Sequence, residues 1–227
     1  MALILSIETS TPACSVALHK DGKLLACYNI ISEKAHSGLI TVLIENIISH
    51  TNYKLNDIDA VAVSKGPGSY TGLRIGVATA KGLCFALDKP LIAINTLEAM
   101  ATYIHNHQFK NDFLLCPMLD ARRMEVYCAI YDTDLKTIIP TKAEIIDENS
   151  FKELLSDNKI IFFGSGAHKS FEILKFNPNA QLIKDVYPSS VSIGSLAKEA
   201  FKNNNFENLT NFEPFYLKDF VSNIKGA

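Results

Sequence analysis

The sequence has 227 residues, 48% of them hydrophobic, and a formal net charge of −2. This length suits one large or two small domains, and the near-neutral charge excludes the overall basic bias of many nucleic-acid binders, though not a local basic patch. Five dispersed cysteines and the lack of any apolar run near 18 residues argue against a disulfide framework or a membrane span, so we expect a cytoplasmic protein.

The first hundred residues predict a mixed sheet with helices packed on it. Three strands come first, and the Asp21-Gly22 pair marks a tight hairpin between the second and the third. Two helices and two more strands then alternate, and a third helix begins near Thr96. This order of hairpins followed by crossover helices is typical of a mixed sheet. The predicted strands are 2–7, 13–19, 24–31, 59–64 and 91–94, and the first two helices are 37–49 and about 71–87.

The second half repeats this order less completely. The predicted strands are 113–119, 125–131, 137–146 with a break at Pro140, and 159–163, and the helices are 149–156 and about 191–203. The tail, residues 211–227, contains aromatic residues without a clear period. We therefore predict two related lobes, 1–107 and a reduced 108–227, built as two copies of one topology.

The segment SKGPGSYTGLRIG, residues 64–76, is the most informative stretch of the chain. It joins a predicted strand to a predicted helix through two glycines around a proline, which fits a sharp turn. Ser69 or Thr71 is expected to cap the helix, and free N–H groups at such a helix start attract anions. A turn that only packs well is the alternative. The candidate contact residues here are Gly66, Pro67, Gly68, Ser69 and Thr71.

The helices predicted at 37–49 and 71–87 are more apolar than a surface helix requires. Apolar residues cover about two-thirds of the first helix, whereas facing one sheet takes a stripe of roughly 100°. In the second, Gly72, Gly76 and Ala80 recur every four residues, a spacing that lets another helix approach closely. Either both helices are buried within their own domain, or they form a subunit interface. The candidate interface residues are Leu39, Ile40, Leu43, Ile44, Ile47, Gly72, Arg74, Ile75, Gly76, Val77 and Ala80.

Asp120 and Arg122 follow a predicted strand, where ligand contacts gather in α/β sheets. They could pair with each other or hold a cleft between the lobes. No two of the six histidines lie four residues apart, the spacing that places two metal ligands on one helix face. The sequence therefore predicts no metal site.

These motifs resemble the TsaB (YeaZ) family. The matching pieces are ILSIETS at 4–10, His36, SKGPGSYTGLRIGVATAKGL at 64–83, NTLEAMA at 95–101 and LDARRMEVY at 119–127. They span the first 130 residues, and the later match is looser, through FGSGA at 163–167 and PFYLK at 214–218. The family usually has Arg where Lys218 stands here.

The resemblance implies a fold of the actin, Hsp70 and sugar-kinase type, with two related α/β lobes and a short second one. It places Glu8, Thr9 and Ser10 where sugar kinases carry a phosphate-facing turn. These three residues could therefore make a weak nucleotide contact, and the alternative is a plain hairpin turn. The metal-binding histidines of catalytic relatives fall at Thr96 and Met100, neither of which supplies an imidazole. No catalytic residue, cofactor or metal is expected.

The resemblance also implies a function. The chain is expected to be a non-catalytic adaptor that dimerises with TsaD and supports threonylcarbamoyl transfer to the adenosine beside the anticodon of tRNA. TsaE with ATP and the tRNA are expected to bind the heterodimer, and the chain alone is expected to form a homodimer. The alternatives are an ATP-dependent kinase or ATPase of the same fold and a metalloprotease, the activity suggested by the glycoprotease label of some relatives.

Overall fold

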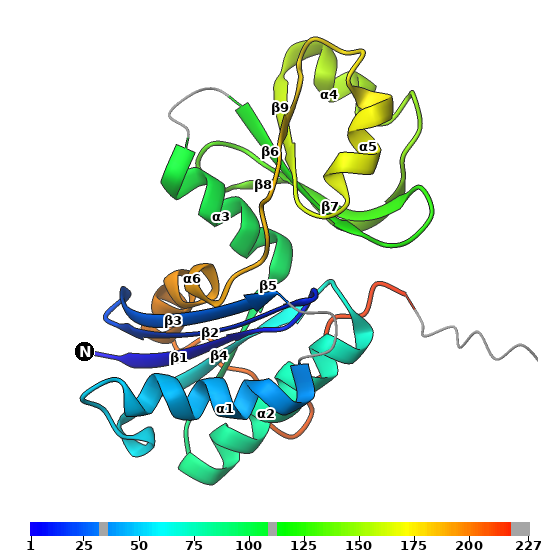
Figure 1. Ribbon diagram of the computed structural model, residues 1–227. Helices are drawn as coiled ribbons and strands as arrows, with labels where there is room; N and C mark the ends of the chain where they lie inside the picture. The colour runs from blue at the N-terminus through cyan, green and yellow to red at the C-terminus, as the bar shows by residue number, and fades with distance from the viewer. Residues whose placement is uncertain (32–35, 109–112, 219–227) are drawn as a thin grey trace, which may run out of the picture.

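The computed structural model describes residues 1–31, 36–108 and 113–218, and it contains two five-stranded sheets (Figure 1). The first has the order β3-β2-β1-β4-β5, and the second has the order β10-β9-β6-β7-β8. The strands of the first sheet are β1 (Leu3–Glu8), β2 (Ala13–Lys20), β3 (Lys23–Ile31), β4 (Ala60–Gly66) and β5 (Leu91–Asn95). Those of the second are β6 (Phe113–Asp120), β7 (Glu125–Tyr131), β8 (Thr137–Ile145), β9 (Lys159–Phe163) and β10 (Ala180–Ile183).

The two sheets share one topology. In each, the first three strands are antiparallel neighbours and the last two join in parallel, so that β6 to β10 correspond one by one to β1 to β5. The predicted duplication is therefore confirmed. The helices are α1 (His36–Ser49), the 3-10 turn η1 (Leu55–Asp57), α2 (Tyr70–Leu87), α3 (Thr96–Gln108), α4 (Lys152–Asp157), α5 (Ala167–Leu174) and α6 (Ser190–Lys202).

Both faces of the first sheet are covered by helices. All six side chains of β1 are buried, and they alternate between the two faces as a strand requires. Leu3, Leu5 and Ile7 pack with α1 and α2 on the outer face, whereas Ile4 packs with α6 on the inner face. None of the helices in the described ranges is long and apolar enough to cross a membrane.

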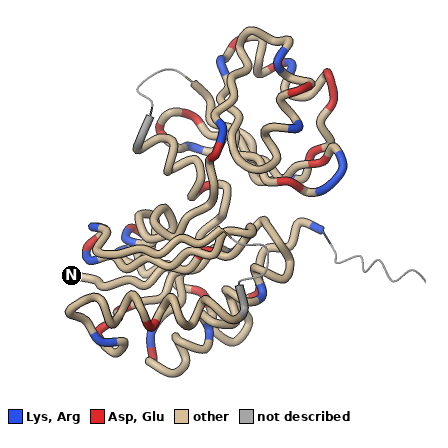
Figure 2. The backbone as a smooth tube through the Cα atoms, viewed as in Figure 1, with Lys and Arg blue, Asp and Glu red and all other residues tan. Residues whose placement is uncertain are grey.

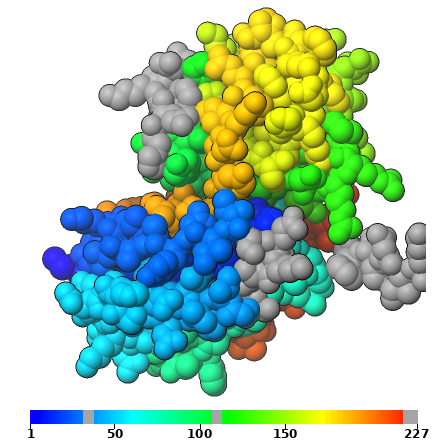
Figure 3. Space-filling model, in the orientation of Figure 1, coloured from blue at the N-terminus to red at the C-terminus, as the bar shows by residue number. Residues whose placement is uncertain are grey.

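The last helix of each half packs on the sheet of the other half. Leu97, Met100 and Ile104 of α3 pack against β6, β7 and β9, whereas Ile193 and Ala197 of α6 pack against the first sheet. In Figure 3 the orange connection after β10 runs over the surface from the upper lobe down to the lower one. In space the C-terminal residues thus return to the first lobe, and the division of the chain near residue 108 stays a prediction.

Three elements differ from the sequence predictions. β8 continues through Pro140, because β8 is an edge strand and a missing N–H is tolerated there. The short elements α5 and β10 follow β9 in a region where the sequence predicted neither. Of the tail without a clear period, residues 211–227, the structure describes residues 211–218, and residues 219–227 lie outside the described residues.

Candidate functional site

The start of α2 fits tightly against the turn between β1 and β2. A Cβ at Gly68 would lie 2.4 Å from the carbonyl oxygen of Ser10, and one at Gly72 would lie 2.0 Å from that of Thr9. A Cβ at Gly76 would lie 2.2 Å from Thr9 Oγ1, which itself donates to the Gly72 carbonyl oxygen at 2.8 Å. The glycine spacing thus serves a close contact within the chain, and Gly72 and Gly76 are not available to an approaching partner helix as the sequence suggested.

The polar groups of the loop before α2 are engaged within the chain. The Ser69 N–H donates to the Ser10 carbonyl oxygen at 2.6 Å, and Ser69 Oγ accepts from the Gly72 N–H at 3.3 Å. Ser69 is therefore the helix cap, as predicted, and an anion contact at this loop stays a prediction. Gly66 and Pro67 are buried, Gly68 is half-buried, and Ser69 and Thr71 are exposed.

Glu8 lies fully buried beneath this loop. Its Oε1 accepts from the Ser10 N–H at 2.6 Å and from the Ser64 hydroxyl at 3.0 Å, whereas its Oε2 has no partner among the described residues. Burial raises the pKa of the Glu8 carboxyl above its usual value, and the two hydrogen bonds oppose this only in part. The neutral form of Glu8 is therefore favoured more in the folded chain than in the unfolded chain.

Glu8→Gln is expected to stabilise the folded chain increasingly as the pH rises. Because the pKa is higher in the folded state than its unfolded value near 4.5, the stability contributed by Glu8 is complete below that pH and is lost above it. The difference in free energy of unfolding, variant minus wild type, should grow from pH 4.5 towards 7. Urea unfolding of both proteins across this range measures it, and parallel curves would contradict the expectation.

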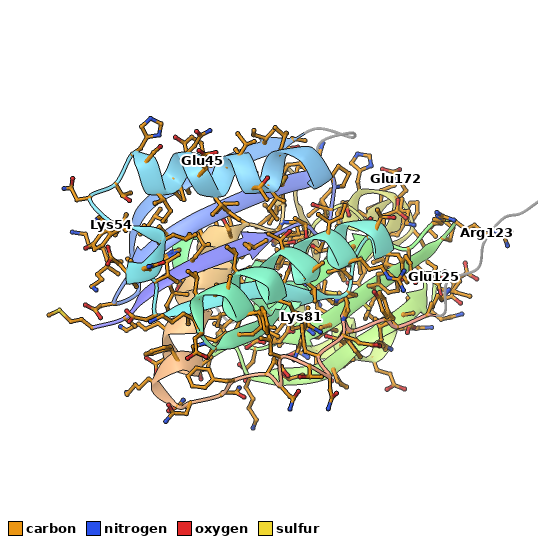
Figure 4. The ribbon with its side chains drawn as sticks, turned by 90° about the horizontal axis from the view of Figure 1, so that it is seen from below. Glu45, Lys54, Lys81, Arg123, Glu125 and Glu172 are labelled. Carbon is orange, nitrogen blue, oxygen red and sulfur yellow. The ribbon has the colours of Figure 1, made fainter. Side chains whose placement is uncertain are left out.

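An apolar groove of about 580 Å³ lies between α1 and α2 on the outer face of the first lobe. Figure 4 looks onto these helices, which lie side by side with Glu45 labelled on α1 and Lys81 on α2. Val42 of α1 is 44% exposed and Phe85 of α2 is 83% exposed, so apolar surface continues on both helices outside the groove. The lining residues are Thr41, Ile44, Glu45, Ile48, Ser49, Leu55, Thr79, Gly82 and Leu83.

Most residues predicted for the interface belong to the core instead. Ile44 and Val77 are 5% and 4% exposed, and both pack against the first sheet. Arginine at either position would therefore disrupt the fold rather than a partner contact alone. The first sheet covers the helix faces that the sequence had assigned to a partner. The sequence could not show this, because a wide apolar arc on a helix does not indicate which part of the arc is covered by the sheet. Ile40, Leu43, Ile47 and Ala80 are likewise buried, whereas Leu39 and Ile75 are half-buried.

The face of α2 that bears both its charged residues is covered by the C-terminal strap, which we define as residues 207–218. Lys81 Nζ donates to the carbonyl oxygens of Thr210 and Phe212 at 3.3 and 3.0 Å. Arg74 Nε donates to Tyr216 Oη at 3.3 Å and lies 4.3 Å from the centre of the Tyr70 ring. No periodic pattern in the sequence predicted this strap, because it is held by single contacts.

Asp120 does not form an ion pair with Arg122. Its Oδ1 accepts from the backbone N–H of Arg122 and from Lys169 Nζ, both at 2.7 Å. Lys169 also donates to the carbonyl oxygens of Arg123 and Glu125 at 2.5 and 2.7 Å. Lys169, which the sequence analysis missed, is therefore the centre of this cluster.

Thr96 and Met100 are buried at the start of α3, with 0% and 1% exposure. Met100 packs in the core between α3 and the second sheet. Among the residues that the structure describes, no three His, Cys, Asp or Glu side chains gather as a metal site requires.

Comparison with known proteins identifies the family. The family model for TsaD, tRNA N6-adenosine threonylcarbamoyltransferase, matches residues 30–224. The tRNA threonylcarbamoyladenosine biosynthesis protein TsaB of Bacillus subtilis is 31% identical over 202 residues, which cover 86% of this chain and 81% of that protein. TsaB of Haemophilus influenzae is 40% identical over 125 residues, covering 55% of this chain, which spans about half (51%) of that relative.

Solved structures agree with this result. YeaZ from Pseudomonas aeruginosa has a TM-score of 0.81 and 25% identity, covering 96% of this chain and 100% of that one. The activator of the 2-hydroxyisocaproyl-CoA dehydratase from Clostridium difficile, solved with bound ADPNP, has a TM-score of 0.52 and 10% identity, covering 91% and 98%. The latter likeness shows the fold alone, which is the actin-like fold of two related lobes. The family model and the similarity along most of the chain together show that this protein belongs to the TsaB (YeaZ) family.

Proposed function

We propose that this chain is a non-catalytic subunit that pairs with a TsaD-type transferase through the groove between α1 and α2. Its relatives are named for tRNA threonylcarbamoyladenosine biosynthesis, and this chain takes part in that biosynthesis. The observation that carries the proposal is the open apolar groove of about 580 Å³, whose two helices carry further exposed apolar side chains, Val42 and Phe85. Exposed apolar surface of this extent marks protein interfaces.

The shape of the groove suits a helical partner. Ridges of side chains on one helix pack into the grooves of another, and Gly82 leaves room because a Cβ there would meet no heavy atom within 4 Å. The family model that matches this chain is that of the transferase itself. A transferase with the same fold would carry equivalent helices, so the two lobes could meet face to face in a pseudo-symmetric pair.

The adaptor role is supported by the residues at two positions that face ligands in related proteins of this fold, the turn at Glu8 and the start of α3. The Glu8 carboxyl is enclosed and hydrogen-bonded to Ser10 and Ser64, and the helix positions that hold histidines in catalytic relatives carry the buried Thr96 and Met100. In this proposal the transferase supplies the chemistry. The chain alone would form a homodimer through the same groove, and TsaE with ATP and the tRNA would bind the assembled pair.

Gly82→Arg tests the pairing. The change places a charge in the apolar groove at an exposed position with open space, so the fold should remain intact while the transferase binds at least about 100-fold more weakly, as interface hot spots do. Gln181→Arg, at an exposed position on the edge strand β10, is the matched control and should bind normally.

Calorimetric titration of the transferase with each variant measures the affinity, and circular dichroism checks the fold. Normal pairing by Gly82→Arg would contradict the proposed interface. ATP turnover by the isolated chain would contradict the adaptor role and favour a kinase or ATPase of this fold. Threonylcarbamoyl transfer by the isolated chain would contradict the adaptor role as well, because the chain would then itself be a transferase.

A further inference from the structure

The sequence uses arginine sparingly and in one region of the structure. Only three of its 22 basic residues are arginine, at positions 74, 122 and 123, and the others are lysine. Arg122 and Arg123 form the tip of the hairpin between β6 and β7, and both are exposed. Figure 2 shows this basic tip on the upper lobe, with a further basic residue at the described end of the strap close by.

Side-chain contacts of the strap connect Arg74 with the neighbourhood of the tip along one edge of the molecule. Arg74 donates to Tyr216 of the strap, and Lys218, two residues further on, forms an ion pair with Glu125 next to the tip. Figure 4 labels Arg123 and Glu125 at this edge. The edge therefore runs from the start of α2, along the strap, to the second lobe.

The tip is held in a fixed conformation. Arg122 and Arg123 have φ of 72° and 47°, and their backbone is tied by Lys169, which donates to the Arg123 carbonyl oxygen at 2.5 Å. The acidic neighbours are already neutralised, since Asp120 pairs with Lys169 and Glu125 with Lys218. Neither tip guanidinium has an ion pair within the described ranges, so both present unpaired charge to solvent.

We propose that Arg122 and Arg123 contact the phosphate backbone of the substrate tRNA in the assembled complex. This inference rests on the proposed function, which brings tRNA to the pair. A guanidinium donates two parallel hydrogen bonds to one phosphate, which an ammonium group cannot do. Apart from Arg74, every other basic residue of the chain is lysine, yet two adjacent arginines stand on an exposed tip whose backbone is hydrogen-bonded, and this is the chemistry that phosphate recognition requires.

Binding of a labelled, unmodified tRNA transcript to the complex of the full chain with its transferase tests the proposal, by fluorescence anisotropy between 50 and 200 mM KCl. The logarithm of the binding constant falls as the logarithm of the salt concentration rises, and each lost phosphate contact makes this negative slope shallower by about one. The double variant R122Q/R123Q should therefore make the slope shallower by about two. R122K/R123K should keep the slope but bind more weakly. K175Q/K202Q removes two exposed charges elsewhere and should change nothing.

The outcomes separate this proposal from the proposed function. An unchanged affinity and slope for an assembled R122Q/R123Q complex would overturn the tRNA contact, as would failure of the unaltered complex to bind tRNA. Loss of pairing with the transferase in that variant would mean that the tip contacts an acidic protein surface, which also overturns it. Failure of the unaltered chain to pair with the transferase would instead refute the proposed function.

Discussion

Gly72→Ala is expected to destabilise the folded chain by about 3 kcal/mol or more, at the upper end of what overpacking costs. The new Cβ would lie 2.0 Å from the Thr9 carbonyl oxygen, far inside contact distance. That oxygen cannot move away easily, because Thr9 is fully buried and its side chain is bonded to the Gly72 carbonyl oxygen at 2.8 Å. The helix and the β1–β2 turn would have to separate.

Gly82→Ala is the matched control on the same helix. A Cβ there meets nothing within 4 Å, so alanine should stabilise the chain by up to about 1 kcal/mol through its higher helix propensity. Urea unfolding followed by circular dichroism measures both changes. Equal effects of the two substitutions would show that the close approach of α2 to the turn does not determine stability.

The second large effect is a loss of stability in acid caused by His19. The ring lies on the inner face of the first sheet, 1% exposed, against Gly194 of α6 and close to Ser6. Neither ring nitrogen has a hydrogen-bond partner in the described part of the chain. Burial lowers the pKa of His19 from 6.5 to about 4. The neutral ring is therefore strongly favoured in the folded state.

The lowered pKa of His19 makes the folded chain less stable in acid. Below pH 6.5 the unfolded chain takes up a proton that the folded chain refuses, so the stability contributed by His19 is complete above pH 6.5 and is lost as the pH falls towards 4. The loss amounts to about 3 kcal/mol at 1.36 kcal/mol per pKa unit. Free energies of unfolding of wild type and His19→Gln, measured between pH 7.5 and 4.5, should converge in acid. The same pH slope in both would contradict the assignment.

Local patterns were sufficient to predict most of the first lobe. Alternating and continuous apolar runs placed β1 to β5, and the Asp21-Gly22 pair placed the hairpin between β2 and β3. The turn predicted a helix start at about Thr71 with Ser69 or Thr71 as the cap, and in the structure the helix begins at Tyr70 with Ser69 as the cap. Short elements such as α5 and β10 gave too little pattern to be recognised.

The candidate interface shows the limit of such patterns. The periodicity of α1 and α2 indicated a wide apolar arc, but it could not indicate which part the sheet covers. Ile44 and Val77 were therefore assigned to a partner, although both are core residues and only Ile44 also lines the groove. Exposed Phe85 and the groove between the helices emerge only when both helices are placed on the sheet.

The amino-acid sequence by itself determined the order of strands and helices, the turn before α2 and the resemblance to one family, because these depend on neighbours along the chain. The tertiary structure alone decided that α3 and α6 pack on each other's sheets, that Gly72 accommodates the Thr9 carbonyl oxygen, and that the strap joins α2 to the second lobe. These contacts join residues far apart in the sequence. No local spacing encodes them, and they form only when the two sheets are assembled.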